Sequence, residues 1–136
     1  MAAFEKVIQV GPDDLDQLQH VNNVRYVQWV QDVAQAHWQA LAPKEILGQV
    51  VWVLLRHHLH YKSQAVLHDH IRIRTYVSST DGVKSTRIVE MFNNKNDQLL
   101  LHSETEWCLL NGKSLRPMRI SDTIKELFSQ STPLSP

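Results

Sequence analysis

Apolar side chains recur at three- and four-residue spacing between Asn23 and Leu41, which is the period of an amphipathic helix. Asn22 precedes this segment as a natural N-cap, and Pro43 follows it and prevents the helix from continuing. The apolar sector is too wide for one narrow contact. The pattern therefore predicts a single long helix that a curved sheet covers. Its main apolar positions are Val27, Val30, Ala34, Trp38 and Leu41.

Five segments are expected to form β-strands, and two of them, residues 49–62 and 70–78, alternate clearly with the period of two that is typical of strands. The first is Phe4–Val10, which ends at Gly11-Pro12 and is expected to be an edge strand. Four more follow the helix, at residues 49–62, 70–78, 83–92 and 99–110, and a turn is expected at 79–82. In the segment 49–62, one side of the strand is expected to carry Val51, Val53, Leu55, Leu59 and Tyr61, and the other Arg56, His58, His60 and Lys62.

This order of elements predicts an α+β fold, in which a curved antiparallel sheet of about five strands wraps around one long central helix. The last four strands are expected to form a meander. Ser121 is a natural N-cap for a short C-terminal helix that ends at Phe128. We expect one domain over residues 1–128 and a disordered tail over 129–136.

Composition narrows the class of protein. The 136 residues include 14 Lys+Arg and 14 Asp+Glu, so that no basic excess supports a nucleic-acid partner. The one cysteine, Cys108, fits a reducing compartment. The N-terminal residues lack an apolar signal core, and no stretch has membrane-spanning length. We therefore expect a cytoplasmic protein without nucleic-acid binding or membrane insertion.

The stretch from Asp14 to Tyr26 concentrates carboxylates, an imidazole and carboxamides at the start of the long helix. The unpaired N–H groups of a helix N-terminus attract negative charge. A carboxylate beside such an end suggests chemistry on a carbonyl group, in which the amides hold the developing oxyanion.

The run Asp16-x-x-x-His20-Val21-Asn22-Asn23-x-x-Tyr26 resembles the signature of hotdog-fold thioesterases of the 4-hydroxybenzoyl-CoA thioesterase superfamily. It is especially similar to the acyl-CoA and acyl-ACP thioesterases. The resemblance implies a single hotdog domain that hydrolyses acyl thioesters as a homodimer or homotetramer. It implies no metal or redox cofactor, because coenzyme A or phosphopantetheine enters as part of the substrate.

By this resemblance, Asp16 is the nucleophile or the general base for water, unless it only caps a turn. The backbone N–H of Asn23 is expected to bind the thioester oxygen. His20 could position Asp16, donate to the thiolate leaving group, or bond within the loop. Tyr26 could lie in the core, at a dimer interface or in a wall of the substrate site. Asp14 is expected to be structural.

The chain departs from its relatives at three positions. Gln19 replaces a glycine that many of them carry, Leu18 replaces an asparagine of plant-type enzymes, and Gln64 replaces a glutamate. The Gln64 carboxamide can orient water or a carbonyl but cannot take a proton, which leaves Asp16 as the base. Arg116 is expected either to contact the phosphates of the carrier or to lie in a solvated turn.

Two other functions compete with hydrolysis. A hotdog module could bind acyl thioesters without turning them over, and Leu18 and Gln64 favour that reading. A hydratase or dehydratase is the other, although its Asp-x-Asn-Pro-hydrophobe-His and His-Phe-Pro-Gly-His runs are absent from the sequence. Five histidines between residues 57 and 70 suggest a metal, but no cysteine or cluster of carboxylates accompanies them at a recognisable ligand spacing. We expect a solvated strand face there. These histidines are His57, His58, His60, His68 and His70.

Overall fold

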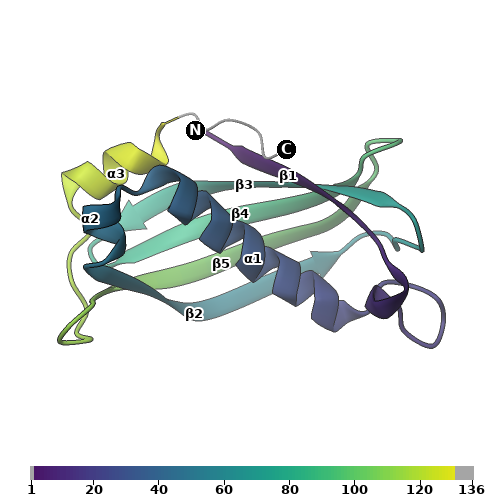
Figure 1. Ribbon diagram of the computed structural model, residues 1–136, viewed down its shortest axis with the longest axis horizontal. Helices are drawn as coiled ribbons and strands as arrows, with labels where there is room; N and C mark the ends of the chain where they lie inside the picture. Colours follow the sequence, from purple (N-terminus) through teal and green to yellow (C-terminus); the bar gives the residue numbers. More distant parts are fainter. Residues whose placement is uncertain (1, 131–136) are drawn as a thin grey trace.

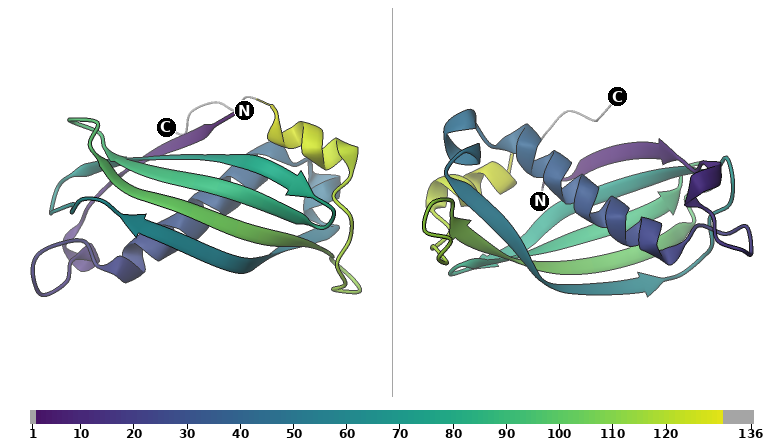
Figure 2. Two further views of the ribbon diagram at one scale, coloured as in Figure 1. Left: turned by 180° about the vertical axis from the view of Figure 1, so that it is seen from behind. Right: turned by 60° about the horizontal axis from the view of Figure 1, so that its bottom comes forward.

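A computed structural model describes residues 2–130 of the chain. The central helix α1 (Asn23–Leu41) lies across one face of a five-stranded antiparallel sheet, as the sequence predicts (Figure 1). The side chain of Asn22 caps the helix by accepting a hydrogen bond from the amide of Val24 at 3.1 Å. The opposite face of the sheet carries no helix within the described residues, which Figure 2 shows from behind.

The strands are β1 (Phe4–Gln9), β2 (Val50–Tyr61), β3 (His70–Asp81), β4 (Lys84–Asn93) and β5 (Leu99–Asn111). Their order in the sheet is β1-β3-β4-β5-β2. The expected four-strand meander is therefore wrong, because only β3, β4 and β5 are consecutive neighbours. β2 pairs with β5 at the far edge, and the loop over residues 62–69 carries the chain back across the sheet to β3.

The expected division of β2 into two faces is also wrong. A β-bulge between Leu54 and Arg56 shifts the register. Even-numbered side chains face the helix before the bulge, and odd-numbered side chains face it afterwards. Before the bulge, Trp52 and Leu54 are partly buried while Val51, Val53 and Leu55 are exposed. After it, His57 and Leu59 are partly buried while Arg56, His58 and His60 are exposed.

Two connections differ from the expectation. β3 continues through Ser79 and Thr80 to Asp81, because these residues pair with Lys84, Ser85 and Thr86 of β4. The turn is thus only Gly82-Val83, where Gly82 has φ of 63°. The connector after α1 contains a one-turn helix, α2 (Lys44–Leu47). The C-terminal helix α3 (Asp122–Phe128) has the predicted Ser121 cap. Residues 131–136 of the predicted tail lie outside the described residues.

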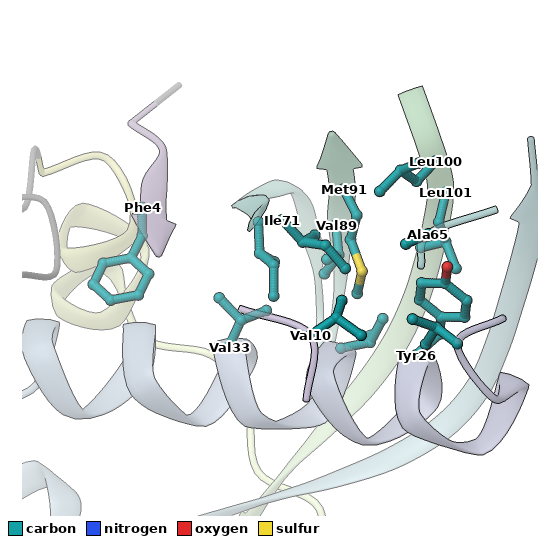
Figure 3. Packing of buried hydrophobic residues seen from close by; sticks show 13 residues of the cluster. Phe4, Val10, Tyr26, Val33, Ala65, Ile71, Val89, Met91, Leu100 and Leu101 are labelled. Atoms are coloured by element: carbon teal, nitrogen blue, oxygen red, sulfur yellow. The ribbon is translucent and has the colours of Figure 1, made fainter. Parts of the chain in front are cut away.

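The core forms two apolar clusters along α1. One surrounds the N-terminal half of the helix and includes Tyr26, Val30, Ile71, Met91 and Leu101 (Figure 3). The other surrounds the C-terminal half and includes Trp38, Leu109, Ile120 and Phe128. No helix within residues 2–130 is long and apolar enough to cross a membrane.

Candidate active site

The loop between β1 and α1 is folded tightly by its own backbone. The amide of Asp16 donates to the carbonyl of His20 at 2.8 Å, and the amide of Gln19 donates to the carbonyl of Asp16 at 3.1 Å. Gln19 has φ of 63°, in the left-handed region that favours glycine. This conformation gives a physical reason for the glycine that many relatives carry at the same place.

The Asp16 carboxylate has one engaged oxygen. Its Oδ1 accepts hydrogen bonds from the amides of Leu18 at 2.9 Å and His20 at 3.2 Å. Its Oδ2 accepts none from the residues that the structure describes. The side chain is partly exposed. Asp16 thus closes the turn with one oxygen and leaves the other available to a substrate or water.

The N-terminus of α1 begins directly after this loop. Asn22 uses its side chain to cap the amide of Val24, and its carbonyl accepts from the amide of Arg25 at 2.9 Å. The amide of Asn23, the first residue of the helix, has no acceptor within residues 2–130. One N–H group at the positive end of the helix therefore remains free to bind an oxygen atom.

Asp14 holds the loop to the helix, which agrees with its expected structural part. Its Oδ2 accepts from the amide of Gly11 at 2.9 Å, and its Oδ1 accepts from Nε of Arg25 at 2.7 Å. Its carbonyl accepts from the amide of Asn22 at 2.8 Å. The Asp14 carboxylate is mostly buried, so these contacts fix the start of α1 against the turn.

The segment after β2 runs beside the loop. The amide of Val21 donates to the carbonyl of Ala65 at 3.0 Å, and His20 forms a β-bridge with Val66. Exposed Gln64 therefore lies in the segment that flanks His20 and Val21. The contact between His20 and Asp16 is made by the His20 backbone, and within residues 2–130 the imidazole has no hydrogen bond to Asp16.

Tyr26 is a core residue close to the loop, whereas Arg116 lies at the other end of β2. Tyr26 is 1% exposed, and its ring packs against Trp29 and Tyr61, both at 5.7 Å between ring centroids. Burial raises the pKa of its hydroxyl. Figure 3 shows the ring among core residues beside Ala65. Arg116 is exposed in the turn after β5, and its carbonyl accepts from the amide of Asn111 at 2.9 Å. Asn111 pairs with Val50, the first residue of β2, so this turn lies at the opposite end of the strand from Tyr61.

A cavity of about 420 Å³ lies at that opposite end, between the C-terminal half of α1, the start of β2, and α3. The sequence predicted neither this cavity nor the buried polar cluster of His37, Thr75 and Arg87 beside it. One signal in the sequence could have indicated that Arg87 is buried. It lies two residues before Val89 and four before Met91, so it shares their buried face of β4. His37 similarly falls in the buried stripe of α1, next to Trp38.

No group of three or more His, Cys, Asp or Glu side chains within residues 2–130 is arranged to hold a metal ion. In particular, His58 and His60 lie together on the exposed side of β2, with ring centroids 5.6 Å apart.

The sequence model of the acyl-ACP thioesterase N-terminal domain matches residues 2–128. The chain belongs to the acyl-ACP thioesterase family. It is therefore an acyl thioester hydrolase with the hotdog fold. A comparison with curated proteins finds no match.

Solved structures share the fold of this acyl-ACP thioesterase family member at low sequence identity. Slr0204, a 1,4-dihydroxy-2-naphthoyl-CoA thioesterase from Synechocystis, is 14% identical with a TM-score of 0.81, over 95% of this chain and 97% of that one. SAV2348 from Staphylococcus aureus, in complex with CoA, is 15% identical with a TM-score of 0.81, over 99% and 90%. The 12:0-ACP thioesterase from Umbellularia californica is 13% identical with a TM-score of 0.79, over 96% of this chain but 52% of that one.

Proposed function

We propose that the chain hydrolyses acyl thioesters at a site formed by Asp16 and the N-terminus of α1. The Asn23 amide binds the carbonyl oxygen, and Asp16 either attacks the carbonyl carbon or takes a proton from the attacking water. In both routes the C–S bond breaks and its electron pair leaves with the thiolate. When Asp16 is the nucleophile, the acyl group is left as an anhydride on Asp16, and water then hydrolyses this anhydride to the free acid and the regenerated carboxylate. His20 and Gln64 border the loop and are assigned to orienting the leaving group and water.

One observation carries this proposal. The segment from Asp16 to Asn23 presents a carboxylate oxygen and a helix N-terminal amide that both lack a partner within residues 2–130. A nucleophile or base beside an unpaired N–H donor is the combination that acyl transfer requires. The family supports the same reaction, since it consists of acyl-ACP thioesterases.

The same proposal includes a homodimer that is formed through β2. β2 is an edge strand, and its Val51, Val53 and Leu55 are 41%, 38% and 48% exposed. An open apolar edge favours pairing with another strand. Two copies that pair antiparallel about a two-fold axis would extend the sheet continuously and keep both α1 helices on one face.

The dimer would bring the cavity and the catalytic loop together. Within one chain they lie apart along α1, because Asn23 and Gln31, the first helix residue that lines the cavity, are eight residues or about 12 Å apart along the helix axis. The Val50 end of β2 lies by the cavity, and Tyr61 at the other end contacts Tyr26 near the loop. Antiparallel pairing places the Tyr61 end of one copy beside the Val50 end of the other. Each cavity would then receive the acyl group, and Asp16 of the partner would act on its carbonyl.

The carrier is proposed to be coenzyme A or an acyl carrier protein. Slr0204 is a CoA thioesterase and SAV2348 was solved with CoA, whereas the Umbellularia enzyme acts on an ACP substrate. Exposed Arg116 lies at the cavity end of the sheet, where it is suited to contact the phosphates of either carrier.

The decisive experiment measures thiol release from a panel of acyl-CoA substrates by wild type, Asp16→Asn and Asp16→Ala. Asparagine retains Oδ1, so it preserves the bonds from Leu18 and His20 while removing the base or nucleophile. We expect kcat to fall by about 10²–10⁴-fold in Asp16→Asn with unchanged stability. Exposed Asp13, in the same loop, provides the matched control Asp13→Asn. Full turnover by Asp16→Asn would refute the mechanism. If activity is lost in Asp16→Ala but kept in Asp16→Asn, Asp16 only forms the turn.

A further inference from the structure

The cavity at the C-terminal half of α1 has aromatic walls. The Trp38 and Trp52 rings meet edge to face at 5.6 Å between centroids, and Phe128 lies 5.7 Å from Trp38. Trp107 and Ser85 also line it. Exposed Gln31, Gln35 and Gln39 of α1 line its solvent side. The volume of about 420 Å³ falls within the range of small-molecule pockets, about 300–1,000 Å³.

Arg87 lines the same cavity although it is only 5% exposed. Its Nη1 lies 2.9 Å from Nδ1 of His37 and donates to Oγ1 of Thr75 at 3.0 Å. Its other guanidinium N–H groups, on Nε and Nη2, have no acceptor within the residues that the structure describes. Among the described residues, the side-chain polar atoms that are both fully buried and without a partner are Tyr26 Oη and His37 Nε2. Nε and Nη2 of Arg87 are therefore unpaired but not completely enclosed.

The charge of Arg87 has no counter-ion in the chain between residues 2 and 130. Neither neighbour across the sheet is acidic, since Val77 and Thr105 pair with Arg87 from β3 and β5. None of the salt bridges among the described residues involves Arg87. His37 cannot compensate, because burial and the nearby Arg87 lower its pKa to about 3 and leave it neutral. Burial lowers the pKa of Arg87 only to about 10, so the guanidinium is charged at neutral pH.

An isolated buried cation is costly unless it is paired, and burying one beside an aromatic cavity makes the cavity selective for an anion. A carboxylate complements a guanidinium especially well, because two of its oxygens match two N–H groups. Simple alkyl chains leave these donors unpaired.

We propose that Arg87 determines substrate specificity by binding a carboxylate at the end of the acyl group farthest from the thioester. This inference rests on the proposed function in one respect, namely that the cavity receives the acyl group. The substrate class is then a thioester of a compact dicarboxylic acid whose body is planar enough to lie between Trp38, Trp52 and Phe128.

The test compares two thioesters of nearly equal shape, 4-carboxybenzoyl-CoA and 4-methylbenzoyl-CoA. For wild type we expect kcat/KM for the carboxylate substrate to be about 100-fold higher or more, because a site built to bond a polar group rejects the analogue that lacks it. Arg87→Met should abolish this preference, and Arg87→Lys should retain part of it. Arg74→Met is the matched control, since Arg74 pairs with Glu90 outside the cavity.

A binding measurement separates this inference from the proposed function, because it requires no turnover. Calorimetry with wild type should detect benzoate more strongly than neutral benzamide. If neither thioester is hydrolysed but benzoate binding depends on Arg87, the proposed function fails and the anion site stands. Hydrolysis of both thioesters at equal efficiency, or equal binding of benzoate and benzamide, would overturn the assignment of Arg87.

Discussion

Nη1 of Arg87 and Nδ1 of His37 lie 2.9 Å apart in the interior, between the two apolar clusters of the core. Since arginine only donates, Nδ1 of His37 must be the acceptor and its proton must reside on Nε2. Nε2 is buried without a partner within residues 2–130. The pair therefore holds His37 as one neutral tautomer, stacked on Phe4 at 5.3 Å between ring centroids.

This arrangement predicts that acid destabilises the fold through His37. Its pKa is lowered from 6.5 to about 3 by burial and by Arg87, so between these values the unfolded chain binds a proton that the folded chain does not. The contribution of His37 to stability is present above about pH 6.5 and is lost as pH falls toward about 3. The free energy of unfolding of wild type, measured with urea, should decrease as pH falls through this window. His37 contributes up to about 1.4 kcal/mol of this decrease per pH unit.

The variant His37→Gln, which keeps an acceptor for Arg87, should show a shallower dependence on pH. Exposed His60 on β2 supplies the control His60→Gln. Identical pH profiles for wild type and His37→Gln would contradict the assignment of His37 as a buried neutral group.

Gln19 predicts opposite effects for two substitutions in the loop. Its φ of 63° places Cβ in a crowded position, which glycine avoids and a β-branched residue tolerates least. Gln19→Gly should match or exceed wild type in stability, whereas Gln19→Val should lose about 1–2 kcal/mol. Chemical unfolding of the three proteins is the measurement. Equal destabilisation by Gly and Val would show that the Gln19 side chain matters more than its backbone conformation.

Gly112 predicts a steric effect at the cavity end of the sheet. A Cβ there would come within 2.8 Å of the carbonyl oxygen of Gln49, to which the Gly112 amide donates at 2.7 Å. Because the Gln49 oxygen belongs to the backbone and cannot move aside as the end of a flexible side chain could, Gly112→Ala should reduce stability by about 1–3 kcal/mol. Gly48→Ala is the control, since its nearest contact would be an ordinary 3.6 Å. Thermal unfolding compares the two, and equal melting temperatures would refute the prediction.

The shared site of the proposed dimer predicts complementation between two inactive chains. One carries Asp16→Asn and the other Ala34→Phe, which places a ring in the cavity that buried Ala34 lines. In a mixed dimer, one site would combine an intact cavity with an intact Asp16. Co-expression should therefore restore about one quarter of wild-type activity, since about half of the dimers are mixed and each has one good site. If the co-expressed chains are no more active than each variant alone, the cavity and Asp16 of one site belong to the same chain.

The helical part of the fold could be predicted from sequence because its signals are local. The Asn22 cap, the apolar period and Pro43 set the bounds of α1, and Ser121 sets the start of α3. The bulge at Leu55 could not be foreseen, because it arises from pairing with β5 rather than from the sequence of β2. The same limit applies to the strand order, which long-range contacts determine.

The candidate site divides in the same way. Asp16, Asn22 and Asn23 lie within eight residues, so a motif was enough to locate them. The cluster of His37, Thr75 and Arg87 brings together residues from α1, β3 and β4, and the partners of Arg87 are 50 and 12 positions away. Only the three-dimensional packing shows that the charge of Arg87 faces a cavity and not solvent.

The strand order has a consequence for how the chain reaches its native state. The hairpins β3–β4 and β4–β5 form between neighbours in sequence, but β1 and β2 are made first and join the sheet at its two outer edges. During synthesis, β2 has no strand to pair with until residues 99–111 of β5 have emerged. Until then, the apolar stripe of α1 and the alternating apolar positions of β2 remain uncovered, which is a state prone to aggregation. The nascent chain is thus expected to need protection through most of its length, and to fold only when its last strand arrives.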